Sequence, residues 1–162
     1  ENHQCPKIIK DRLFRFHLVD NVRGQTLPFA PEEIKVADLS TQITGLNGKE
    51  ITIEISGRSK AIAKGPWLLG ENIWTPAHDL DHEINTSVLG YATFDLKNNE
   101  FVKFELVAIC EWRGKTENNG RKFGPERGQI GILYDIADNS YVNRIAPTFI
   151  DQYNATWIEQ PD

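Results

Sequence analysis

Residues 86–112, TSVLGYATFDLKNNEFVKFELVAICEW, decide the fold of this chain. Over 86–96 and again over 101–112, apolar side chains recur at every second position, which is the period of a β-strand. The intervening segment 97–100, Lys-Asn-Asn-Glu, is made of residues that tolerate the backbone of a tight turn. The stretch therefore predicts a long antiparallel hairpin with one strongly apolar face.

The same alternation occurs elsewhere in the chain. Residues 50–57 alternate directly after Asn47-Gly48, a dipeptide typical of hairpin turns. Residues 129–136 and 13–19 also alternate, so both are expected to be strands. Helical signals are few: Pro31-Glu32-Glu33 could open a single turn, and no long helical repeat follows it.

Several long strands joined by local connections indicate an all-β domain with little helix. The expected architecture is an antiparallel β-barrel, calycin-like or similar, with a two-sheet β-sandwich as the alternative. No internal repeat or linker divides the chain, so residues 1–162 are expected to form one domain, with 139–162 as a C-terminal strap or short helix. The barrel is favoured because small residues lie where a closed sheet must bend: Gly57, Gly90, Ala92, Ala108 and Gly131.

The composition fits one soluble domain. The chain has 162 residues, a mass of 18.4 kDa and 40% hydrophobic residues, which is enough for one filled core. Its net charge of -5 argues against binding to a nucleic-acid backbone, which requires a basic surface. The mean hydropathy is -0.44, and no apolar run is long enough for a membrane span. The oligomeric state is left open.

Three features favour a secreted or periplasmic location. The chain begins at Glu1 and contains no Met, which fits a mature form whose signal peptide has been removed. Asn85-Thr86-Ser87 and Asn154-Ala155-Thr156 match the N-glycosylation pattern. Cys5 and Cys110 permit one disulfide, which would close a loop of about 105 residues and stabilise the fold by roughly 4–5 kcal/mol. Two unpaired thiols are the alternative.

The densest group of ionisable side chains is HDLDHE at residues 78–83. His78 and His82, four residues apart, would lie on one face of a helix and could chelate a zinc or copper ion, with Asp79 or Asp81 completing the set. A carboxylate-rich calcium loop is a second interpretation, and an ordinary polar loop before a strand is a third. A divalent metal is the one cofactor that the sequence suggests.

A basic, glycine-rich segment, RGKTENNGRKFGPERG, covers residues 113–128. It reverses the sign of charge in an acidic chain, and it is long for a connection between two strands. Guanidinium groups match carboxylates and phosphates, so the segment is expected to bind a small or anionic ligand, with a solvated loop as the alternative. The candidate ligand-binding residues are Arg113, Lys115, Arg121, Lys122 and Arg127, together with the aromatic side chains of Trp67 and Trp74.

Catalytic patterns are missing from the sequence. It contains no nucleophile elbow, phosphate-binding loop, dinucleotide fingerprint or zinc-protease helix. Cys110 as a nucleophile with His17 as its base is one pair to consider, but a cysteine on the apolar face of a strand is usually inert. Trp112 lies on that same apolar face and is expected in the core.

Three pieces of the chain, with the basic segment between the last two, carry a resemblance over residues 51–137: IEISGRSKA, LGYATFDLKNNEFVKFELVAICEWRG and GQIGILYDIA. They resemble a group of uncharacterised secreted bacterial proteins. That group usually has a His before the Trp where this chain has Glu111-Trp112. No activity is established for the group, so the resemblance implies secretion and an all-β fold and gives no mechanism.

These patterns predict a secreted or periplasmic, non-catalytic domain that binds a small or anionic ligand at one end of a barrel. The alternative is a metal-assisted enzyme centred on residues 78–83. A third interpretation is an interaction domain of a surface assembly that has no pocket.

Overall fold

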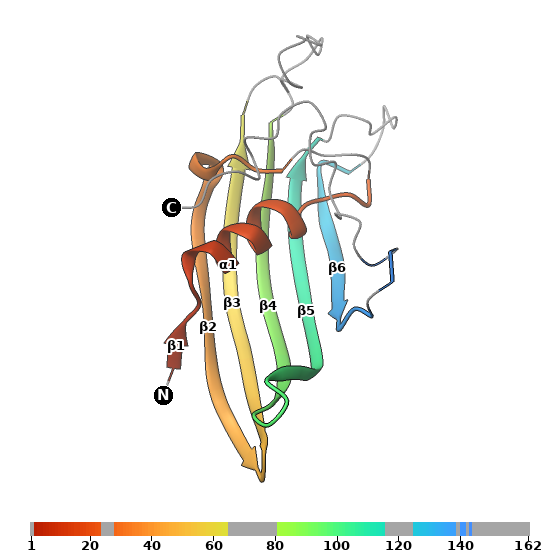
Figure 1. Cartoon of the computed structure of the whole chain (residues 1–162). Coiled ribbons are helices and arrows are strands. Elements are labelled where there is room, and N and C mark those ends of the chain that lie inside the picture. Colours follow the sequence, from red (N-terminus) through yellow and green to blue (C-terminus); the bar gives the residue numbers. More distant parts are fainter. Residues whose placement is uncertain are drawn as a thin grey trace.

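The computed structural model describes residues 2–23, 28–64, 81–115, 125–138, 140, 141 and 143. Six strands form one antiparallel sheet in the order β1-β2-β3-β4-β5-β6 (Figure 1). This arrangement confirms the predicted all-β class. The strands are β1 (Asn2–Gln4), β2 (Ile34–Asn47), β3 (Glu50–Ala63), β4 (His82–Asp95), β5 (Glu100–Gly114) and β6 (Arg127–Asp135).

The two predicted hairpin turns are present. Gly48 in the β2–β3 turn has φ 61°, and Asn99 in the β4–β5 turn has φ 57°, so both occupy the left-handed region that such turns need. Asp95 closes the second turn because its carboxylate accepts the backbone N–H groups of Lys97 (2.7 Å) and Asn98 (3.1 Å). The turns fix the register of the long strands, since each strand begins pairing directly beside its turn.

The sheet is open, so the favoured barrel is not formed. β1 and β6 are its two edges and do not pair with each other. All strands of the described residues belong to this single sheet, so the described part of the chain does not form the alternative two-sheet sandwich either. A barrel hides its inner face by closing; here one face is covered instead by an N-terminal helical segment (Figure 1). We call this covered face the inner face and the opposite one the outer face.

The interpretation of residues 13–19 as a strand is wrong. Helix α1 (Lys7–Arg12) and the π-helical turn η1 (Leu13–His17) form the helical segment instead. Phe14 lies within η1 and Leu18 directly follows its last residue, and the exposures of the two side chains are 1% and 0%. In a strand, Phe16 would share the buried face of Phe14 and Leu18; in the structure Phe14 and Leu18 are buried, whereas Phe16 is only partly buried.

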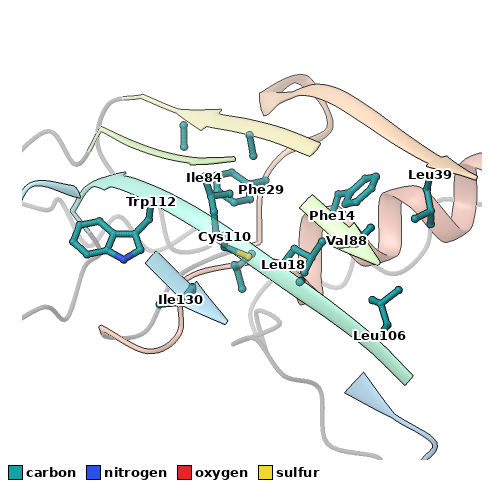
Figure 2. Packing of buried hydrophobic residues seen from close by; sticks show 14 residues of the cluster. Phe14, Leu18, Phe29, Leu39, Ile84, Val88, Leu106, Cys110, Trp112 and Ile130 are labelled. Atoms are coloured by element: carbon teal, nitrogen blue, oxygen red, sulfur yellow. The ribbon is translucent and has the colours of Figure 1, made fainter. Parts of the chain in front are cut away.

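The core lies between this helical segment and the inner face of the sheet. Figure 2 shows Phe14 and Leu18 among the inner-face side chains of β4 and β5. The predicted apolar face of β5 is confirmed from Phe104 to Trp112, whereas Val102 is exposed because a register shift in the β4–β5 pairing interrupts the alternation. The buried cluster consists of Phe14, Leu18, Val19, Phe29, Leu39, Ala61, Ala63, Ile84, Val88, Leu106, Ala108, Cys110, Trp112 and Ile130.

Glycines on the inner face allow neighbouring strands to approach closely. A Cβ at Gly90 would lie 2.6 Å from the carbonyl oxygen of Glu105 and 2.8 Å from Leu106 Cδ1. A Cβ at Gly57 would be equally tight against β2, where it would lie 2.9 Å from Leu39 Cδ1. The sequence predicts these glycines as bends of a barrel; in the structure they leave room for the leucines of the adjacent strands.

Strand β2 is the one long strand that the sequence pattern does not reveal. Only Leu39 is buried among its 14 residues, so its alternation of apolar and polar positions is weak. The single turn predicted at Pro31–Glu33 is confirmed as the 3₁₀-helix η2. The strap or short helix predicted for 139–162 lies outside the described residues, apart from 140, 141 and 143. No helix within the described ranges has the length and apolar character needed to cross a membrane.

Gly90→Ala is expected to lower the free energy of unfolding by about 1–3 kcal/mol, because the new Cβ meets a backbone carbonyl of the paired strand. Gly45→Ala is the matched control: its Cβ would lie 3.5 Å from Thr52, an ordinary contact, so stability should change by less than about 0.5 kcal/mol. Urea unfolding followed by circular dichroism measures both variants. Equal effects would contradict the close approach at Gly90.

Candidate functional site

Two of the segments that the sequence proposes separately meet at one end of the sheet. The ends of β3 and β5 and the starts of β4 and β6 lie together there (Figure 1). His82 is the cross-strand partner of Gly114, and Lys115 donates its backbone N–H to the carbonyl of Asp81 (3.3 Å). The end of the proposed metal segment is therefore a direct neighbour of the start of the basic segment.

Gly114 is the point of closest approach between these segments. Its φ of 91° lies in the region that favours glycine, and a Cβ there would overlap the carbonyl oxygen of Asp81. Its N–H donates to the carbonyl of Glu126 (2.9 Å), and its own carbonyl accepts a hydrogen bond from Arg23 Nη1 (2.9 Å). Only a glycine can join these partners without strain.

The proposed metal ligands are not brought together in the described part of the chain. His78 and Asp79 lie outside it. His82 lies on the inner face, where its ring packs against Phe29 with 5.2 Å between the centroids. Among the described residues, no three His, Cys, Asp or Glu side chains form a group that could hold a metal ion. The metal site stays a prediction.

Arg113 and Arg127, which the sequence assigns to a loop, are strand residues. They are cross-strand partners at the ends of β5 and β6, on the outer face, and both are exposed. Neither forms an ion pair with another described residue. Two like charges placed directly opposite each other weaken a sheet. Lys115 follows β5 directly; the other candidate ligand residues, Arg121, Lys122, Trp67 and Trp74, lie outside the described residues.

An acid, Glu83 on β4, is the cross-strand partner of Arg113. Its carboxylate forms an ion pair with Lys60 (2.9 Å) and accepts a hydrogen bond from Asn85 (2.9 Å). These contacts lower the pKa of Glu83, and the charge of Arg113 adds to the effect. Because Lys60 already balances Glu83, the two arginines keep an excess of positive charge.

On the inner face, the same end of the sheet is closed by Arg23, a residue that no sequence motif marks. Its guanidinium lies 3.3 Å from the centre of the Trp112 ring and forms an ion pair with Asp20. The side chains of Asp20 and Arg23 are only 7% and 13% exposed. Gly128 leaves room for the indole, because a Cβ there would lie 2.6 Å from Trp112 Cζ2. Trp112 is therefore a core residue, as predicted.

The thiol of Cys110 has the environment of a packing residue. It is fully buried, burial raises its pKa, and Thr86 Oγ1 donates a hydrogen bond to its sulfur (3.3 Å). Burial, aided by the charge of Arg12, lowers the pKa of His17, which makes its ring a weaker base. Cys5 and Cys110 are both free, so the structure contains two unpaired thiols and no disulfide between them.

The outer face carries a group of exposed apolar side chains, which we call the outer strip. Pairing sets Leu89 of β4, Val107 of β5 and Leu133 of β6 in one row across the sheet. Tyr91 lies one row toward the β4–β5 turn, and Ile109 lies one row toward the opposite end. The exposed fractions of the five side chains run from 46% to 70%. The alternation of β5 places Val107 and Ile109 on this face, but only the strand register shows that Leu89 and Leu133 lie beside them.

Comparison with known proteins identifies no matching protein-family model, no matching curated protein and no matching solved structure. The resemblance of residues 51–137 to secreted bacterial proteins and the secreted or periplasmic location therefore stay predictions.

Asp20→Ala is expected to lower the free energy of unfolding by about 3–5 kcal/mol, because it leaves the buried guanidinium of Arg23 without its carboxylate. Asp38→Ala is the control: it removes a surface ion pair with Arg58 (3.9 Å) and should cost no more than about 1 kcal/mol. Thermal and urea unfolding measure both. A loss at Asp20 no larger than the loss at Asp38 would show that the Arg23 contact is not part of the core.

Proposed function

We propose that this protein is a non-catalytic interaction domain that binds a protein surface through the outer strip. The observation that carries the proposal is the contiguity of Leu89, Val107 and Leu133, which form an exposed apolar row over three adjacent strands. Folded monomers seldom leave such a group in water. Polar rows on both sides of the strip resemble the rim that surrounds the apolar centre of a protein interface.

The packing of the inner face also favours the outer face as the binding surface. The inner face is filled by the helical segment and the residue directly after it, since Phe14 and Leu18 are almost fully buried against the sheet. Since the sheet is open and this face is occupied, the binding surface that we propose is the outer face and not the end of a barrel.

A photo-crosslinking amino acid at Leu133 is expected to trap a protein partner in the native cells of this chain, because Leu133 is the most exposed member of the outer strip at 70%. Ile8 on helix α1 is a matched control position, since it is also apolar and 65% exposed. Mass spectrometry identifies the adducts. The proposal predicts adducts at position 133 and few at position 8; no adducts at 133, or equal yields at both positions, would contradict it.

An anion-binding site is a second candidate, favoured by Arg113 and Arg127. Their guanidinium groups lie on directly paired residues, and no ion pair with a described residue balances them. A bound phosphate or carboxylate would offset their repulsion and accept their hydrogen bonds. The neighbouring connection contains Arg121 and Lys122, which would add to the positive charge.

Sodium phosphate is expected to raise the melting temperature of the wild type above its value in sodium chloride of equal ionic strength, and the double variant Arg113→Gln/Arg127→Gln should lose this difference. In chloride the double variant should be as stable as the wild type or more stable by a few tenths of a kcal/mol, because a repulsion is removed. Arg58→Gln, which removes an exposed cation of the same face, should keep the phosphate effect. If phosphate does not stabilise the wild type, the anion-binding site is contradicted.

A further inference from the structure

We infer that the partner of the outer strip is a second copy of this chain, packed face to face so that two open sheets form one sandwich. This inference rests on the proposed function and names the partner of the same surface. Charge and shape both vary along the outer face. As a result, one copy of the face is complementary to a second copy in the opposite orientation.

Cross-strand pairing arranges the outer face in rows whose charge differs at the two ends of the strip. One end, the basic end, has the row Glu83, Arg113 and Arg127. The opposite end, the acidic end, has the row Glu54, Tyr91, Glu105 and Asp135. Between the basic row and the strip lies Glu111, whose carboxylate accepts a hydrogen bond from Gln129 (3.2 Å).

Ion pairs within the chain do not cancel this difference. Each end contains one such pair, Lys60–Glu83 at the basic end and Lys103–Glu105 at the acidic end, both at 2.9 Å. The remaining charges of the end rows, which form no ion pair within the described part of the chain, are Arg113 and Arg127 at the basic end and Glu54 and Asp135 at the acidic end.

A two-fold axis perpendicular to the strands brings the basic end of one copy over the acidic end of the other. An isologous interface makes each contact twice, so both ends meet opposite charge at the same time. Arg127 and Asp135 lie on the same strand, β6, on either side of Gly131, which places the axis near that glycine. Two sheets stacked in this way lie about 10 Å apart, with strands crossing at about 30°.

The apolar centre of the strip is also complementary to itself. Leu133 is 70% exposed, whereas Gly131, on the same face of β6, has no side chain. Within the described part of the chain, a Cβ at Gly131 would meet only Ile109 Cδ1, at 4.0 Å, so no described side chain fills this position. With the axis at Gly131, the two glycines face each other, and the space between them lies beside Leu133 of both copies, whose side chains extend into it. One surface therefore supplies both the protruding side chain and the space for it.

Sedimentation equilibrium of the full chain tests this inference. The wild type is expected to be a dimer of twice its 18.4 kDa mass. Arg127→Glu alone and Asp135→Lys alone should each raise the dimer dissociation constant at least about tenfold, because each change places like charges at two symmetric contacts. The double variant Arg127→Glu/Asp135→Lys should recover the wild-type constant to within about threefold, since opposite charges face each other again.

Lys49→Glu, a charge reversal in the β2–β3 turn away from the strip, is the control and should leave the constant unchanged. Leu133→Lys should produce monomers, and circular dichroism confirms that each variant keeps its sheet. A monomeric wild type overturns the inference, and so does a dimer whose dissociation constant does not respond to these substitutions.

The crosslinking experiment at position 133 separates the failure of this inference from the failure of the proposed function. If the chain is monomeric and position 133 crosslinks to a different protein, the proposed function holds and a second copy is the wrong partner. If position 133 crosslinks instead to residues 139–162 of its own chain, the strip is an internal contact and both proposals fail.

Discussion

The packing of Phe14 and Leu18 against the inner face of the sheet is the interaction on which the rest of the structure depends. An antiparallel meander of long strands has two faces and no core of its own, so it needs an element that covers at least one of them. The helical segment Lys7–His17 and the residue that follows it do this, with Phe14 and Leu18 almost completely buried. Every member of the buried cluster that belongs to a long strand lies on the face that this segment covers.

A single helical segment covers one face only, which leaves the outer face to other contacts. Strand β5 carries apolar residues on both faces, with Ala108 and Cys110 on one side and Val107 and Ile109 on the other. Apolar residues on both faces are typical of a strand that is buried on both sides. Within the described chain only its inner side is buried, so the sequence of β5 and the burial of β5 disagree. A partner on the outer face removes this disagreement.

The elements that the sequence predicts correctly are those whose signal is local. Strands β3 to β6 combine alternation with turn residues such as Asn47-Gly48, and both signals act within a few residues of each other. The openness of the sheet has no local signal, because it depends on whether β1 and β6 pair across the whole molecule. The contacts of Arg23 cannot be predicted from local sequence for the same reason, since its partners Trp112 and Gly114 are about ninety residues away. Arg113 and Arg127 are predicted as a basic group, but only the register shows that they are directly opposite each other.

The small residues that favoured a barrel separate into two groups once each is assigned to a face. Gly57, Gly90, Ala92 and Ala108 lie on the inner face, and at the two glycines close contacts between strands account for the lack of a side chain. Gly131 lies on the outer face, where packing among the described residues does not account for its lack of a side chain. The inner-face glycines are small because the core of one chain must be packed. If Gly131 makes space for Leu133 of a second chain, its small size has the same cause on the outer face. The two-sheet sandwich that the sequence predicts as an alternative then forms between two chains, because the described residues of each chain supply one sheet.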